Sequence, residues 1–171
     1  MHHLPLHIQN HPQLINAYRP NVAAVIQRAD GKLLWCERVK HPHTWQFPQG
    51  GVDKNEPLLD ALFRELKEEL GIANPRDLLT VKKQLPTTFR YNFPVPIIER
   101  YLNQGLSSYI GQEQHWFHLS FSGSDTDINL SFEGELSEFR NFKWGKGEML
   151  PLVAHFKRNN YKSILRSFSI L

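Results

Sequence analysis

The sequence contains only one cysteine, Cys36, so no disulfide bond can form within the chain. We expect this thiol to be packed inside a strand, because free cysteine usually behaves as a small buried hydrophobic residue. No apolar run approaches the ~20 residues needed to span a bilayer. The amino-terminal segment, with its histidines and two prolines, lacks the apolar core of a secretory signal. These absences predict a cytoplasmic protein without a membrane segment.

The sequence also lacks the motifs of several large enzyme classes. It has no Walker phosphate loop, no G-x-G-x-x-G and no G-x-S-x-G, which argues against a kinase, a dehydrogenase and a serine hydrolase. Nine histidines suggest zinc, but His2, His3, His41 and His43 lie in loop-like segments without cysteine partners or zinc-binding spacing. No long lysine and arginine block is present, so any contacts to RNA should be few.

The overall composition is that of a folded enzyme domain. Of the 171 residues, 40% are hydrophobic and 22% are charged. The net charge of +3 and the pI of about 9.0 indicate a mildly basic surface, which is compatible with polyanionic substrates. We expect residues 1–16 to form an N-terminal arm that is partly disordered or draped on the body, and residues 17–171 to form one domain.

Turn signals and apolar runs predict a mixed sheet. Residues 22–27 and 32–37 are expected strands, and the Asp30-Gly31 pair between them predicts a hairpin. The other expected elements are strands at residues 79–89, 97–101, 115–121 and 139–144, loops at 102–112 and 122–137, and a closing helix at 150–169. A mixed β-sheet between α-helices, an α/β fold, is the natural outcome.

One helix is delimited clearly by its sequence. Pro57 suits a first helical turn, and Gly71 suits the position after the last turn. Between them, apolar residues recur at helical spacing and predict the side that faces the core. These residues are Leu59, Leu62, Phe63, Leu66 and Leu70.

The same helix carries three glutamates, Glu65, Glu68 and Glu69. Residues three and four apart are neighbours on a helix, so these like charges repel one another by several tenths of a kcal/mol per pair. Lys67 projects to the other side and does not neutralise them. Since hard divalent cations such as Mg²⁺ prefer carboxylate oxygens and substrate phosphates, the cluster is a plausible wall of a metal site for phosphate chemistry.

The helix is part of a longer pattern that consists of Gly50, Glu56 and the continuous run Arg64–Ile72. With these positions, the segment from Gly50 to Ile72 resembles the Nudix box. The resemblance implies a Nudix fold and hydrolysis of a nucleoside diphosphate linked to another group. It implies that Mg²⁺, or Mn²⁺, is held by Glu65, Glu68 and Glu69. It further implies that four motif residues are chiefly structural: Gly50, Glu56, Arg64 and Gly71.

The resemblance extends over about residues 17–168 to one branch of the Nudix family. Further matching segments are Tyr18–Val22, Trp45–Gly51, Gly111–Phe117, Ser137–Phe139, Phe142–Trp144 and Phe156–Arg158. This branch contains bacterial RNA pyrophosphohydrolases and the similar dinucleoside polyphosphate hydrolases. The implied substrates are therefore RNA 5′ ends, from which pyrophosphate is removed, or dinucleoside polyphosphates. The alternative is a non-catalytic Nudix module that senses nucleotides, against which the intact acidic box argues.

The resemblance also implies a catalytic glutamate outside the box, Glu138, which would approach the metals and could serve as base. With Glu68 and Glu69 it completes the expected catalytic group. Which of these carboxylates takes the proton stays open, because metal-bound carboxylates are weak bases.

Six further residues are candidates for substrate binding. Arg19, Arg38 and Lys157 could bind phosphates, and an arginine suits this role because its planar guanidinium matches phosphate oxygens. Tyr91 and Phe156 resemble residues that flank a nucleobase, although Phe156 could instead pack the last helix. The sixth candidate, Gln112, would either bond to substrate or lie on a strand edge.

Overall fold

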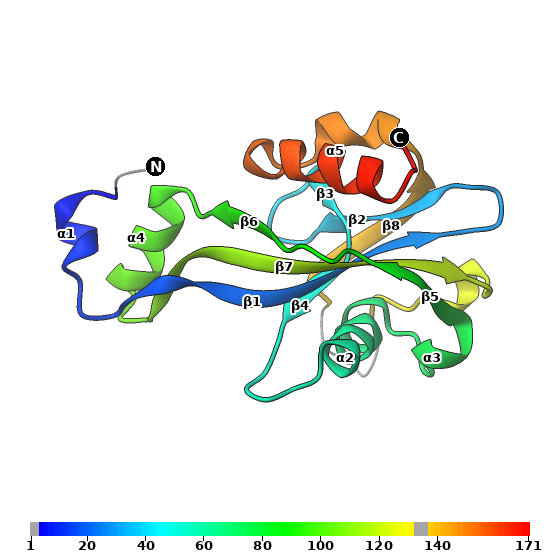
Figure 1. Ribbon diagram of the computed structural model, residues 1–171, viewed down its shortest axis with the longest axis horizontal. Coiled ribbons are helices and arrows are strands. Elements are labelled where there is room, and N and C mark those ends of the chain that lie inside the picture. The colour runs from blue at the N-terminus through cyan, green and yellow to red at the C-terminus, as the bar shows by residue number, and fades with distance from the viewer. Residues whose placement is uncertain (1–3, 132–136) are drawn as a thin grey trace.

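The computed structural model describes residues 4–131 and 137–171, and it contains a mixed sheet flanked by helices (Figure 1). The strands are β1 Leu14–Gln27, β2 Leu33–Arg38, β3 Trp45–Gln46, β4 Gln49–Gly51, β5 Leu79–Gln84, β6 Phe89–Asn92, β7 Ser108–Phe121 and β8 Phe139–Gly145. The α-helices are α1 Leu6–Gln9, α2 Leu58–Leu70, α3 Pro75–Leu78, α4 Val95–Asn103 and α5 Arg158–Ser167. Helix α2 covers one face of the sheet and α5 the other, which confirms the predicted architecture.

The sheet is built around two long parallel strands, β1 and β7. The main path has the order β3-β2-β1-β7-β5, with β4 paired to β1, β6 to β7 and β8 to β2. The β1–β7 register runs from Leu14↔Ser108 to Gln27↔Ser120. The predicted hairpin is confirmed, since Gln27 pairs with Leu33 and Gly31 supplies the left-handed turn residue, at φ +80°.

The second half of strand β1, residues 22–26, lies between two hydrophobic cores, which explains its uninterrupted apolar run. Val22, Ala24 and Ile26 face the core under α2, whereas Ala23 and Val25 face the core under α5. Because successive side chains of a strand point to opposite faces, a strand buried on both sides must be apolar at every position. On β2, Cys36 is fully buried as expected.

The expected strand at residues 97–101 is wrong, because this segment lies within helix α4. Pro94 precedes the first turn and Pro96 lies within it, where a missing N–H costs no hydrogen bond. Ile98 and Leu102, four residues apart, are both buried on one side of the helix. This tertiary burial outweighs the preference of β-branched isoleucine for strands.

Other boundaries also differ from expectation. Strand β1 begins at Leu14, ahead of the expected strand at 22–27 and inside the expected 1–16 arm. The expected strand at residues 79–89 is divided into β5 and β6, with Pro86 between them. Strand β7 begins within the expected 102–112 loop. The expected closing helix consists of two 3₁₀ segments, Gly147–Leu152 and His155–Lys157, followed by α5.

The first described residues pack onto a protruding end of the molecule (Figure 1). Helix α1 lies against α4, and Ile8 is buried with Ile98 and Leu102 in a small separate cluster. His7 Nε2 lies 3.0 Å from Glu99 Oε1 and links the two helices at the surface. In the part of the chain that the structure describes, no helix is both long and apolar enough to cross a membrane.

Candidate active site

Helix α2 presents the three glutamates beside the sheet, as its sequence predicts. Its apolar side buries Leu62, Leu66 and Leu70, which fixes the rotation of the helix. Gly71 ends it in a left-handed conformation, and its N–H donates to Lys67 O. One expected member of the apolar side is wrong, since Leu59 is 43% exposed.

The three glutamates differ in their exposure to solvent. Glu69 is buried, at 6% exposure, whereas the Glu65 and Glu68 side chains are 15% and 59% exposed. Glu65 lies directly over Gly50 of β4. A Cβ at Gly50 would stand 1.8 Å from Glu65 Cδ, so only glycine admits this carboxylate. The box glycine thus brings the loop backbone against the helix.

Glu69 joins the helix to β4 and lies in an unfavourable electrostatic environment. Its Oε2 accepts a hydrogen bond from Gln49 N at 3.1 Å. Burial, followed by the charges of Glu138 and Glu65, raises the pKa of Glu69 well above its usual value. Burial also raises the pKa of Glu65. The charges of Glu68 and Glu138 raise it further, whereas the Arg64 guanidinium opposes this shift. Negative charge is therefore concentrated here beyond what the protein neutralises.

These carboxylates fit a divalent cation by their chemistry. They supply hard oxygen donors, and a bound cation would relieve the repulsion that raises the pKa values of Glu65 and Glu69. Among residues 4–131 and 137–171, no three His, Cys, Asp or Glu side chains are close enough together to enclose a metal ion. Within those ranges, holding a metal through three carboxylates would therefore require a side-chain rotation, for which the exposed Glu68 has room.

Arg64 ties the loop after β4 to helix α2. Its Nε and Nη2 donate to the two carboxylate oxygens of Glu56 at 2.8 Å, and Nη2 also donates to Gly51 O at 2.9 Å. Its Nη1 donates to Glu65 Oε1 at 2.8 Å. The hydrogen bonds from Arg64 lower the pKa of Glu56 to about 2. Glu56 Oε2 in turn accepts from Asp53 N at 2.9 Å, so the loop and the helix are braced together.

Glu138 lies on the segment that enters β8, close to Glu69. The preceding residue, Ser137, donates its hydroxyl to Glu69 O at 2.7 Å. Val39 N donates to Glu138 O at 2.8 Å, which attaches the segment to the end of β2. The charge of Glu138 raises the pKa of Glu69, so the two carboxylates lie within electrostatic reach of each other.

Basic side chains gather near the carboxylates. Lys157 is 5% exposed, and burial followed by the charge of Arg38 lowers its pKa to about 7. Arg19 packs on β4, where a Cβ at Gly51 would stand 2.4 Å from its Nη2. The site thus combines an acidic wall, formed by Glu65, Glu68 and Glu69, with cations from β1, β2 and the 3₁₀ segment before α5.

Two aromatic rings lie beside Lys157. Its Nζ is 5.2 Å from the centroid of the Tyr91 ring and 5.9 Å from that of Phe156. The centroids of these two rings are 5.6 Å apart, and their planes are inclined at 49° to each other. Tyr91 is buried, whereas Phe156 is 37% exposed and therefore available at the surface rather than packed in the core.

Comparison with known proteins identifies the family. A model described as NUDIX domain matches residues 17–166. The chain belongs to the Nudix family. It is 39% identical to an RNA pyrophosphohydrolase of Baumannia cicadellinicola over 154 residues, covering 89% of this chain and 92% of the relative. It is 38% identical to an RNA pyrophosphohydrolase of Psychrobacter arcticus over 156 residues, covering 88% and 84%.

Solved structures agree on the fold of this Nudix hydrolase. The E. coli dihydroneopterin triphosphate pyrophosphohydrolase superposes with a TM-score of 0.63 at 22% identity, covering 88% of this chain and 97% of the other. The family and the named relatives show that the protein is a hydrolase acting on phosphoanhydride bonds.

A buried amide network supports the Nudix site and was missed at the sequence level. Gln49 Nε2 donates to Gln112 Oε1 at 3.4 Å, and Gln114 Nε2 donates to Gln49 Oε1 at 2.9 Å. The Tyr91 hydroxyl also donates to Gln112 Oε1. Lys157 Nζ donates to Gln49 Oε1 at 3.4 Å. The side-chain oxygen of Gln112 therefore has protein partners, and the role of this residue as a substrate contact stays a proposal.

Proposed function

We propose that this Nudix hydrolase removes pyrophosphate from the 5′-triphosphate end of RNA, with Mg²⁺ or Mn²⁺ as the cofactor. The observation that carries the proposal is the convergence of the acidic wall with Lys157 and the exposed Phe156. The naming of two relatives as RNA pyrophosphohydrolases, at 38–39% identity over most of both chains, supports the same substrate.

The acidic wall would hold the cofactor through Glu65, Glu68 and Glu69. A bound divalent cation would neutralise phosphate charge and promote ionisation of the attacking water. We assign the acceptance of the water proton to Glu138, because it lies outside the box, whereas the three box carboxylates would be weakened as bases by metal binding.

The cations and rings would position the substrate. Lys157, Arg38 and Arg19 would bind phosphate oxygens opposite the carboxylates, where water-poor surroundings strengthen such contacts. Phe156 would stack on the first base, supported from behind by Tyr91. Stacking of this kind is worth ~1 to 3 kcal/mol and tolerates any base.

The test is Mg²⁺-dependent turnover of 5′-triphosphorylated RNA, compared with diadenosine tetraphosphate because both offer phosphates and a base. We expect a higher kcat/KM on RNA, with pyrophosphate and a 5′-monophosphorylated RNA as products. Glu69→Gln should reduce turnover by at least about 100-fold without unfolding, because it keeps the shape of the side chain and removes its charge. Faster cleavage of the dinucleotide would refute the RNA assignment, and no cleavage of either substrate would support a nucleotide-sensing module instead.

A further inference from the structure

The loop between β2 and β3, residues 39–44, presents cationic side chains beyond the catalytic carboxylates. In Figure 1 this loop extends from the β2–β3 pair toward the end of the molecule that carries β6 and α4. Lys40, His41 and His43 are all exposed on it. The Nudix box and the amide network use none of these three side chains.

The loop is held in place by contacts to the proposed site. Val39 N donates to Glu138 O at 2.8 Å, and Arg38 N donates to Thr44 O at 3.0 Å. At its tip, His43 N donates to the buried Glu37 carboxylate at 2.8 Å, with His43 in the left-handed region at φ 63°. Both ends of the loop are therefore attached to residues next to the site, and its exposed cations have a defined position relative to it.

A second element brings another cation to this loop. Arg100 lies in the last turn of α4, at the protruding end of the molecule. Burial, and then the charges of Arg38, Arg100 and Lys40, lower the pKa of His41, so all three cations lie within electrostatic reach of its ring. Within the ranges that the structure describes, neither Lys40 nor Arg100 forms an ion pair with a carboxylate. Their positive charge is thus left for a ligand.

We infer that Lys40, His41 and Arg100 form a rim that binds backbone phosphates of the RNA downstream of its 5′ nucleotide. This inference rests on the proposed function. The rim adjoins Arg38, whose charge lowers the pKa of the buried Lys157, and it continues away from the carboxylates, so a polyanion longer than one nucleotide could follow it. A dinucleoside polyphosphate carries all its phosphates between two nucleosides and has no downstream backbone. The rim therefore favours RNA as the substrate.

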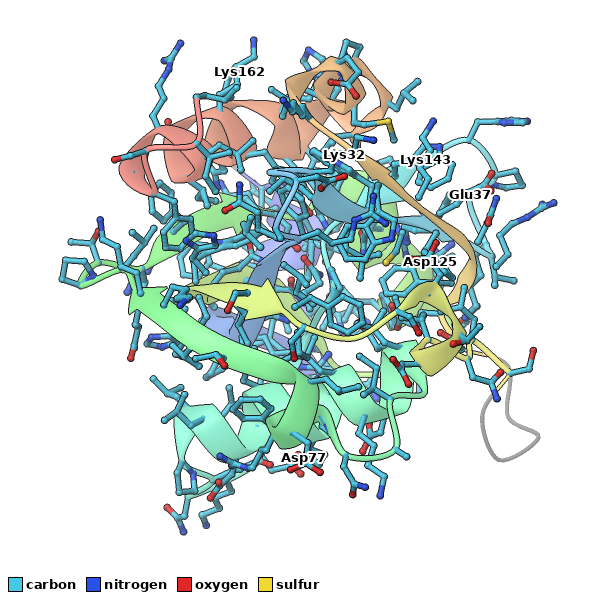
Figure 2. The ribbon with its side chains drawn as sticks, turned by 90° about the vertical axis from the view of Figure 1, so that its right-hand side faces the viewer. Lys32, Glu37, Asp77, Asp125, Lys143 and Lys162 are labelled. Atoms are coloured by element: carbon cyan, nitrogen blue, oxygen red, sulfur yellow. The ribbon has the colours of Figure 1, made fainter. Side chains whose placement is uncertain are left out.

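The test compares the double variant Lys40→Gln/Arg100→Gln with the wild-type protein on triphosphorylated RNA of about ten nucleotides, at several salt concentrations. Each contact to a single strand contributes about 0.7 to the slope of log affinity against log salt. If two contacts are lost, the ratio of wild-type to variant kcat/KM should therefore be about sevenfold larger at 50 mM than at 200 mM salt. The matched control is Lys162→Gln/Arg166→Gln on α5. Figure 2 shows Lys162 at the outer surface of this helix, and both residues are exposed.

We expect the rim variant to change diadenosine tetraphosphate hydrolysis by less than about twofold, and the control to change neither substrate by more. A rim variant that matches the wild type on RNA at every salt concentration would overturn the inference and leave the proposed function standing. An equal loss on both substrates would also overturn it, since the cations would then act on the shared catalytic site. If the wild type did not cleave RNA, the proposed function would fail first and the rim with it.

Discussion

Gly50→Ala should inactivate the enzyme while leaving most of its stability intact. The new Cβ would stand 1.8 Å from Glu65 Cδ and 2.0 Å from Glu65 Oε2, which is far inside van der Waals contact. The backbone at Gly50 has little freedom to yield, because β4 pairs with β1 at Val22. The Glu65 carboxylate must therefore rotate away from β4.

The stability cost of this rotation should be modest. An unfavourable rotamer costs about 0.5 to 1.5 kcal/mol. The partly buried hydrogen-bonded pair with Arg64, now at 2.8 Å, would be weakened or lost, at a cost of about 0.2 to 1 kcal/mol. We expect a total of about 1 to 2 kcal/mol, because the moving atoms are the end of a flexible side chain. A displacement of about 1 Å in a positioning group can cost 100-fold in rate, so kcat should fall by about that factor or more.

The matched control is Gly51→Ala, in which the Cβ meets Arg19 Nη2 at 2.4 Å instead of a carboxylate. Since Arg19 is a proposed phosphate ligand, this variant should raise KM more than it lowers kcat. Urea unfolding and steady-state kinetics on triphosphorylated RNA measure both effects. The reasoning would be refuted if Gly50→Ala kept a third or more of the wild-type kcat, a loss of less than about threefold, or if its inactivity came with global unfolding.

Two further substitutions test the cationic side of the site. Lys157→Met should stabilise the protein at neutral pH by a few kcal/mol, because the lysine pKa falls from 10.5 to about 7 on burial. At pH values between these two pKa values the unfolded chain binds more protons than the folded protein, so wild-type stability should rise with pH. The stability advantage of Lys157→Met should therefore shrink toward pH 10 in denaturant titrations. An advantage that did not change with pH would contradict the lowered pKa of this lysine. Arg64→Lys should destabilise by about 1 to 3 kcal/mol, since an ammonium cannot reproduce the paired hydrogen bonds to Glu56. Carbon-detected NMR titration should show the Glu56 pKa returning toward its usual value, and an unchanged pKa would contradict this explanation.

Several of the predicted features that hold are governed by local sequence. Helix α2 follows from apolar spacing and from Gly71 at its end, and the β1–β2 hairpin follows from Gly31 in its turn. In contrast, α4 depends on burial of Ile98 against Ile8, some ninety residues earlier in the chain. No local pattern around residues 97–101 contains that contact, and two adjacent isoleucines favour a strand in its absence.

The candidate site, likewise, contains some features that local sequence predicts and others that depend on distant contacts. The acidic wall and the Arg64–Glu56 contact lie within one continuous segment, so a sequence pattern can carry them. The amide network joins Gln49, Gln112 and Gln114 from two strands that are not sequence neighbours. Their alternation on β7 indicates only that the two glutamines share one face of the strand. Their partners depend on how β4 and β7 lie beside β1.

The way in which each glutamate is held argues for different parts in the reaction. Glu69 is fixed from three directions, by its helix, by Gln49 N on its carboxylate and by Ser137 on its carbonyl. Glu68 is more than half exposed, and the one ion pair that it forms among the described residues is with Arg64, at 3.6 Å. In the proposed reaction, a site that releases pyrophosphate and RNA after each cycle would need both kinds of ligand. The fixed carboxylate would keep the geometry that makes the attack selective, and the exposed one would let the cation and the product leave without unfolding the helix that positions them.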